Sequence, residues 1–201
     1  MTAYTDFTSD FPRRCLEVLD TASADAAANG REITLLLMVA SASLLVPFER
    51  LKPDTEYSAH PSGDNKRYGA AAGQLKELLD KRFVGSELCP ATKHSWQLAK
   101  EVQTVEGAMD SWLPKVKLKS LSASKQVGST LTLIRNALAH GSIYATGDPI
   151  KELVFVKEVL DKDRKRVGFD VLQVSHGDFK QFVRAWIAFL QASDKDAGSK
   201  L

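Results

Sequence analysis

The sequence predicts a mainly α-helical protein, in which a helical bundle is followed by a C-terminal β-hairpin and a closing helix. Up to residue 141, most segments repeat their apolar residues with the spacing of an α-helix. After that residue come two short runs rich in β-branched residues, and then helical spacing returns. The 201 residues are enough to bury a substantial core, and we expect one domain over residues 1–201.

The first two predicted helices have clear start signals. Ser9 or Asp10 can cap the first, with Pro12 in its opening turn, where proline is tolerated. Asn29 can cap the second, whose apolar stretch at residues 33–48 is shorter than the roughly 20 residues of a membrane span. We therefore expect a central core helix in a cytoplasmic protein that has no membrane partner.

Two later helices are separated by polar connectors. One is expected over residues 67–83, and the other opens at Ser122 or Ser124 and carries the stretch IRNALAHG at residues 134–141. Between these helices, residues 94–113 are expected to form one or two short helices, followed by a basic connector.

The C-terminal part has a different pattern. The β-branched runs at residues 150–160 and 166–174 predict a hairpin with a longer turn. Ser175 and Asp178 have the spacing of a capping box, which opens the last helix. The expected parts are the bundle, the hairpin with its final helix, and a frayed polar tail: about 9–141, about 142–192 and 193–201.

Composition excludes several classes of function. The formal net charge of +2 is too small to argue for nucleic acid by itself. The two cysteines, Cys15 and Cys89, fit no metal motif, and His60 and His94 have no paired ligands nearby. We therefore expect no metal and no cofactor.

The stretch IRNALAHG combines an apolar stripe with a polar one. At about 100° per residue, a narrow core stripe is expected from Val127, Leu131, Ile134 and Leu138. Asn136 and His140 are four residues apart and lie on the opposite face, which Ser129 and Leu133 continue. Leu133 would be an exposed apolar residue within a polar face, and this pattern predicts a partner surface there.

The polar residues of this helix form a coherent chemical set. Histidine can accept or donate a proton near neutral pH, and His140 is expected on the last turn before Gly141. The guanidinium of Arg135 matches phosphate oxygens, and the amide of Asn136 can orient either group. This set suits metal-free cleavage of a phosphodiester, in which the arginine stabilises the charged transition state.

The sequence RNALAH resembles the signature of the HEPN superfamily, in which an arginine and usually a polar residue precede a histidine; here four residues separate Arg135 from His140. HEPN proteins are helical bundles, and many are metal-independent ribonucleases of toxin–antitoxin and antiviral systems. The resemblance implies that Arg135 and His140 are catalytic, with Asn136 supporting them. It also implies a homodimer that covers Ser129 and Leu133, an RNA substrate, and an antitoxin or regulatory protein as a further partner.

Residues outside the motif are candidates for RNA binding. Lys119 and Lys125 belong to the basic connector before the motif helix and would add salt-dependent affinity; the alternative is a solvated linker. Some HEPN toxins carry a tyrosine two residues after the histidine. Here that position is Ser142, and the nearest tyrosine is Tyr144, which we include as an RNA-binding candidate.

Three functions fit the sequence. The leading one is a metal-independent endoribonuclease of HEPN type with a composite active site at a dimer interface, acting as a toxin or antiviral defence factor. The alternative is a catalytically inactive HEPN-like module that binds RNA, a nucleotide or a partner protein. The third is a purely structural helical dimer.

Overall fold

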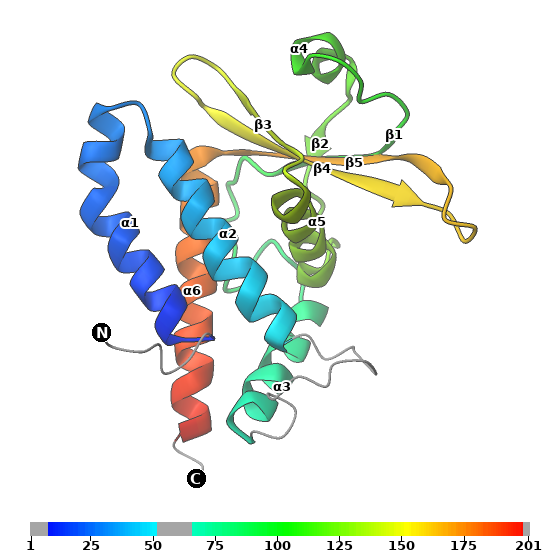
Figure 1. The fold of residues 1–201 in the computed structure, drawn as a ribbon. Helices are drawn as coiled ribbons and strands as arrows, with labels where there is room; N and C mark the ends of the chain where they lie inside the picture. Colours follow the sequence, from blue (N-terminus) through cyan, green and yellow to red (C-terminus); the bar gives the residue numbers. More distant parts are fainter. Residues whose placement is uncertain (1–7, 52–65, 199–201) are drawn as a thin grey trace. The chain divides into compact units, whose positions relative to one another are not determined.

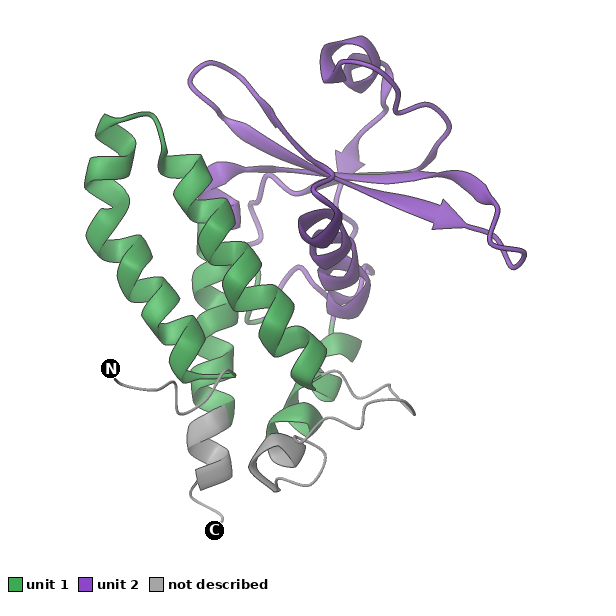
Figure 2. Ribbon diagram, viewed as in Figure 1, with its two compact units in different colours: residues 1–81, 87–89, 180–201 green, residues 82–86, 90–179 purple. Residues whose placement is uncertain are grey.

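The computed structural model describes residues 8–51 and 66–198 (Figure 1). The chain forms two compact units (Figure 2). Unit 1 comprises residues 1–81, 87–89 and 180–201, and unit 2 comprises residues 82–86 and 90–179. The predicted loop that contains His60 lies outside the described residues.

Unit 1 is helical. Its helices are α1 (Asp10–Ala28), α2 (Glu32–Leu51), α3 (Lys66–Asp80) and the part of α6 (His176–Gly198) from residue 180 onward. These elements confirm the helices predicted for these segments. The core includes large side chains that are almost fully buried: Leu19, Leu36, Leu44, Leu75, Leu78 and Trp186.

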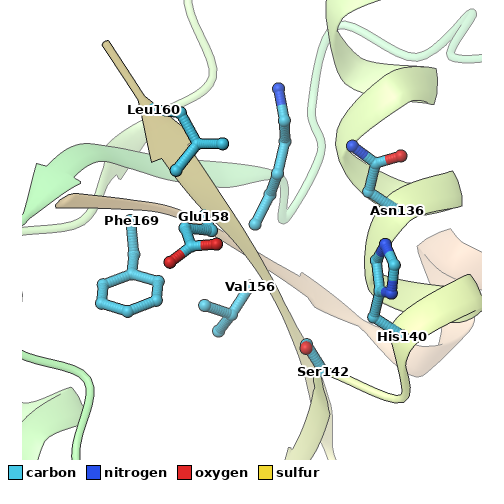
Figure 3. Close-up of a pocket in the computed structure, with 8 residues that line it drawn as sticks. Asn136, His140, Ser142, Val156, Glu158, Leu160 and Phe169 are labelled. Atoms are coloured by element: carbon cyan, nitrogen blue, oxygen red, sulfur yellow. The ribbon is translucent and has the colours of Figure 1, made fainter. Parts of the chain in front are cut away.

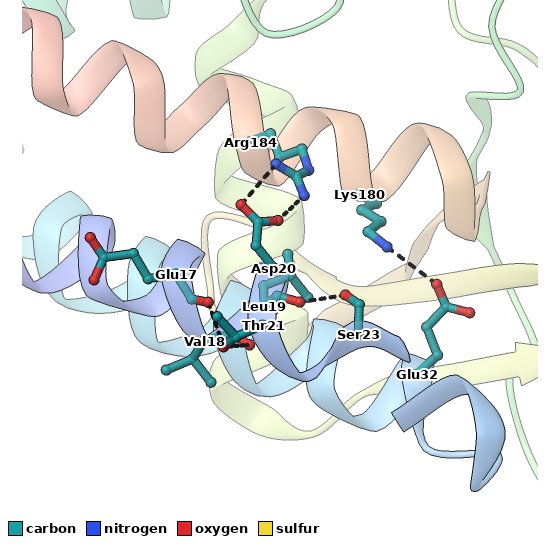
Figure 4. A network of polar contacts seen from close by, with 9 residues as sticks. All are labelled: Glu17, Val18, Leu19, Asp20, Thr21, Ser23, Glu32, Lys180 and Arg184. Carbon is teal, nitrogen blue, oxygen red and sulfur yellow. Dashed lines mark hydrogen bonds and ion pairs between the residues drawn. The ribbon is translucent and has the colours of Figure 1, made fainter. Parts of the chain in front are cut away.

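Polar contacts fix α6 against α1 and α2 within unit 1 (Figure 4). Arg184 forms an ion pair with Asp20 of α1, and the ammonium of Lys180 lies 3.3 Å from Glu32 of α2. The indole N–H of Trp186 donates a 2.9 Å hydrogen bond to the backbone carbonyl of Ser43 in the middle of α2. The apolar helix α2 is therefore packed on a neighbouring helix in this unit.

The composition of α2 also meets the criteria for a membrane span. The most apolar 18-residue window of this 20-residue helix has a mean hydropathy of 1.6, and 39% of that window is buried inside the structure. Core helices of soluble proteins pass the same test. The expectation that α2 is a core helix agrees with its contact to Trp186, and the absence of a membrane partner stays a prediction.

Unit 2 is built on a five-stranded antiparallel sheet with the strand order β2-β1-β5-β4-β3. The strands are β1 (Gln97–Val102), β2 (Lys119–Ser120), β3 (Ile143–Thr146), β4 (Glu152–Leu160) and β5 (Arg166–Ser175). Helix α5 (Val127–His140) packs against β4 and β5 (Figure 1). The other face carries a cluster around Trp112 of the short helix α4 (Met109–Trp112), which the 3₁₀ turn η2 (Leu113–Lys115) continues.

The predicted fold class, a helical bundle with only a hairpin of strands, is wrong. The hairpin β4–β5 is present, with Phe155 opposite Leu172, but three further strands extend it into a sheet. Strand β1 lies in the segment expected to be helical. Its sequence QLAKEV has no β-branched residue except its last, and its extended form depends on pairing with β5 and β2. Tertiary pairing therefore overrides local propensity here.

The start of α6 keeps half of the predicted capping box. The backbone N–H of Asp178 donates to the hydroxyl of Ser175 over 3.2 Å, as such a box requires. The carboxylate of Asp178 instead accepts hydrogen bonds of 2.6 Å from both the N–H and the hydroxyl of Ser95. At its other end, α6 continues to Gly198, so the prediction of a frayed tail from residue 193 is wrong up to that residue.

Candidate active site at the end of helix α5

Helix α5 ends at His140, as the sequence predicts. Gly141 adopts a left-handed conformation with φ of 67°, which glycine tolerates without strain, and its N–H bonds to the carbonyl of Ala137. The N–H of Ser142 bonds to the same carbonyl over 2.9 Å. The chain then enters β3 at once, so the last turn of α5 is held beside the sheet of unit 2.

The buried face of α5 is wider than the predicted stripe of four residues. It also includes Thr130, Leu133 and Ala137. Leu133 is only 2% exposed, so the expectation that it forms an exposed apolar spot is wrong. At 100° per residue, Leu133 lies next to Thr130 and Ala137 on the helix, and all three are buried together. Of the two residues predicted for a dimer interface, only Ser129 is exposed.

Asn136 and His140 line a hollow with a volume of about 440 Å³ (Figure 3). The other lining residues come from the position just before β3 and from the β4–β5 hairpin: Ser142, Val156, Lys157, Glu158, Leu160 and Phe169. His140 is exposed, and Asn136 is half-buried. The guanidinium of Arg135 donates a 2.7 Å hydrogen bond to the side-chain carbonyl of Asn136, so Arg135 is joined to one of the two motif residues that line this hollow.

The hollow follows the edge of β4. Strand β3 pairs with β4 only along Glu152–Phe155, and its last contact is the 3.0 Å bond from the N–H of Val156 to the carbonyl of Ser142. Past that point no described strand pairs with this edge. Successive residues of a strand point to opposite faces, and both Lys157 and Glu158 line the hollow. The hollow is therefore open to side chains from both faces of the sheet.

A family model described as HEPN pEK499 p136 matches residues 1–197. The chain belongs to this HEPN family. The match extends over both units, whereas the resemblance noted from the sequence depended on one short motif. No curated protein and no solved structure matches the chain.

Lysines lie at and near the hollow of this HEPN protein. Lys157 lines the hollow and lies opposite Asp170 in the sheet register. Burial is the main cause that lowers the pKa of the nearby Lys125. The positive charges of Lys100 and Lys157 lower this pKa further, whereas the negative charge of Asp170 raises it. Lys125, a predicted RNA-binding residue, therefore belongs to a cluster of three lysines around one carboxylate. Lys119 is exposed on β2, opposite Leu98.

Tyr144, the third residue predicted to bind RNA, is not among the residues that line the hollow. It packs edge-on against Trp112, with ring centroids 5.6 Å apart, and it pairs with Val154 in the sheet. Both neighbours belong to the hydrophobic cluster on the face of the sheet that carries α4. This packing gives Tyr144 a structural role in that cluster.

The hairpin residues of the hollow are not in the sequence prediction. Lys157 and Glu158 have the pattern of a solvated strand, and Phe169 has that of a core residue. The packing of α5 against β4 and the register that sets Phe169 opposite Glu158 bring them beside His140. Within the residues that the structure describes, no group of three or more histidine, cysteine or acidic side chains could hold a metal ion.

Proposed function

We propose that this HEPN protein is a metal-independent endoribonuclease whose active site is the hollow at the end of α5. The observation that carries the proposal is the connection of three residues: Asn136 and His140 line the hollow, and Arg135 is hydrogen-bonded to Asn136. A proton-transfer group, a fixed cation and an orienting amide are the groups that phosphodiester cleavage without a metal requires.

His140 is the proton-transfer residue in this proposal. Its exposed imidazole takes the proton from a ribose 2′-hydroxyl, whose oxygen then forms a bond with the adjacent phosphorus. The bond from phosphorus to the 5′-oxygen breaks, and that oxygen receives a proton from the imidazolium of His140 in a second copy of the chain. The products are a 2′,3′-cyclic phosphate and a 5′-hydroxyl.

Arg135 stabilises the negative charge that develops on the phosphate. An arginine side chain is long and flexible, and ordering it costs conformational entropy. The hydrogen bond to Asn136 offsets this cost by holding the guanidinium beside a residue of the hollow. The lysines at positions 100, 125 and 157 add sequence-independent attraction for the phosphates on either side.

A second copy of the chain completes the proposed site. Two α5 helices that face each other would bring two histidines to one phosphate, one as base and one as acid. The exposure of Ser129 and His140 on this helix supports an accessible face, although Leu133 no longer contributes to it. In a cytoplasmic toxin or defence factor, an antitoxin or regulatory protein would act by covering this face.

The test is cleavage of a single-stranded RNA and of its DNA counterpart in buffer that contains EDTA. We expect the RNA to be cut and the DNA to stay intact, because only RNA carries the attacking hydroxyl. A single 2′-deoxy nucleotide at the cleaved position should block that cut alone. RNA that is bound but never cut would instead favour the alternative, an inactive HEPN module that binds RNA. Cleavage that requires added metal would refute the mechanism.

A further inference from the structure

We propose that the part of the hollow formed by β4 and β5 binds a guanine base of the RNA and that Glu158 selects it. The inference rests on the proposed function, since it assigns a base-binding subsite beside the phosphate held at His140. The two ends of the hollow have different chemistry. Asn136, His140 and Lys157 suit a phosphate, whereas Glu158, Leu160 and Phe169 do not.

The hairpin end of the hollow offers an apolar surface with an aromatic ring. Val156, Leu160 and Phe169 all line it, and Leu160 is 47% exposed although it is a large aliphatic residue. The guanidinium of Arg166 lies 5.2 Å from the ring centroid of Phe169, which fixes the ring. Bases of single-stranded RNA bind to such surfaces by stacking on aromatic or guanidinium planes.

Glu158 is the one acidic residue among those that line this hollow. Alternation along β4 puts its side chain on the same face as Val156 and Leu160, so the carboxylate lies beside the apolar surface (Figure 3). Its ion pair with Arg166 spans 3.9 Å, and both side chains are about half exposed. A pair of this length is weak, so the carboxylate oxygens retain acceptor capacity for a ligand.

An ionised carboxylate accepts hydrogen bonds only, and its two oxygens match two parallel donors. Guanine presents such donors, N1–H and the N2 amino group, side by side on its Watson–Crick edge. Adenine and cytosine present one amino group beside an acceptor, and uracil presents one N–H between two carbonyl oxygens. A carboxylate opposite those edges would leave an acceptor facing an acceptor. Glu158 therefore favours guanine over the other three bases.

The charge distribution also fixes the direction of the nucleotide. Glu158 repels a phosphate, and Lys157, on the opposite face of the same strand, attracts one. Figure 3 shows Asn136 and His140 on α5, on one side of β4, and Glu158 and Phe169 on the other side. A bound guanosine phosphate would thus extend from His140, where its phosphate lies, across the edge of β4 to Phe169.

The experiment measures binding of the four nucleoside 3′-monophosphates by calorimetry, in buffer without metal. The wild type should bind 3′-GMP at least about tenfold more tightly than the others, because two hydrogen bonds to a charged group are gained. Glu158→Gln should abolish this preference. Glu106→Gln, which makes the same charge change at an exposed residue outside the hollow, should keep it. Leu160→Ala should weaken all four ligands, because it removes apolar contact from the subsite.

Equal binding of all four nucleotides, or a preference for 3′-GMP that survives Glu158→Gln, would overturn the inference. A failure of the proposed function gives a different result. RNA cut in EDTA at all bases alike would leave the ribonuclease and exclude the guanine subsite. Selective binding of 3′-GMP by a protein that cuts no RNA would leave the subsite and exclude the ribonuclease.

Discussion

Arg135 is connected to the hollow by its neighbour in the sequence. Its guanidinium donates to the side-chain carbonyl of Asn136, which is among the residues that line the hollow. An asparagine at this position therefore has a positioning role that an apolar residue cannot take. The same helix turns an exposed residue, His140, and buried residues, Leu138 and Ala137, to different sides within one turn.

Replacing Asn136 tests this positioning role. Asn136→Leu removes the acceptor. The cleavage rate should then fall by about tenfold or more, because that is the usual effect of losing a hydrogen bond to a charged group. Asn136→Gln keeps an uncharged carbonyl acceptor for Arg135 and should retain more activity than Asn136→Leu. Initial rates on one RNA, with folding checked by circular dichroism, give the comparison. Equal activity in the two variants would contradict the role.

Replacing Leu133 tests the burial that the structure assigns to it. Leu133→Ala should lower the free energy of unfolding by about 2–5 kcal/mol, the usual cost of truncating a buried leucine. Leu131→Ala, at a fully buried position, should have a similar effect. Ser129→Ala, on the exposed side, should change stability by less than about 0.5 kcal/mol. Urea denaturation measures all three, and a Leu133→Ala variant as stable as Ser129→Ala would contradict the burial.

Strand β4 contributes residues both to the core of unit 2 and to the hollow at the end of α5. Its apolar residues belong to the core of unit 2, whereas the end that β3 leaves uncovered carries Lys157, Glu158 and Leu160. The β4–β5 hairpin could be predicted from its β-branched residues, and α5 from its apolar spacing. The strands β1, β2 and β3 could not, because they are short and their extended form depends on neighbours that are distant in the sequence.

The same limit applies to the candidate site. Residues within one helix have a spacing that can be read from the sequence, so Arg135, Asn136 and His140 were found together. Glu158 and Phe169 join them only through the packing of α5 against β4 and the register that sets Phe169 opposite Glu158, and no local pattern specifies either. The sequence predicts an exposed Leu133, but the residue is buried. This prediction is wrong because the sequence does not reveal how wide the buried face of a helix is.

The lysine cluster beside α5 leads to a prediction about salt. Lys157→Gln and Lys125→Gln should each weaken RNA binding for all sequences alike. Each should also reduce the slope of log K against log salt by about 0.7, the value for one contact to a single-stranded phosphate. Lys162→Gln, at the exposed hairpin turn, is the matched control and should leave the slope unchanged. Fluorescence anisotropy at several salt concentrations measures the slopes. If all three variants kept the slope of the wild type, the cluster would not belong to the RNA-binding surface.

At the scale of the whole molecule, the HEPN family match covers residues 1–197, which include both compact units. The candidate residues of the hollow all belong to unit 2. A composite site therefore requires that α5 of one copy be accessible to α5 of another. Because Leu133 is buried, an interface there would be more polar than the sequence suggested.

The oligomeric state can be tested by a charge placed on the exposed face of α5. We expect the wild type to form a two-fold dimer. Ser129→Arg should weaken it, because each copy would bring a cation to the same interface. Light scattering over a range of concentrations gives the mass, with Ser120→Arg, on an exposed strand residue, as the control. A wild type that stays monomeric at high micromolar concentration would exclude the composite site.

The most direct measurement of the central claim is the rate of RNA cleavage in EDTA by wild type, His140→Ala and His94→Gln, with the product ends identified by mass spectrometry. We expect 2′,3′-cyclic phosphate ends from the wild type. We also expect a rate at least about 10²-fold lower for His140→Ala, because a positioned proton-transfer group contributes that much, and an unchanged rate for His94→Gln. A His140→Ala protein that cuts RNA as fast as the wild type, or a wild type that cuts none, would contradict it.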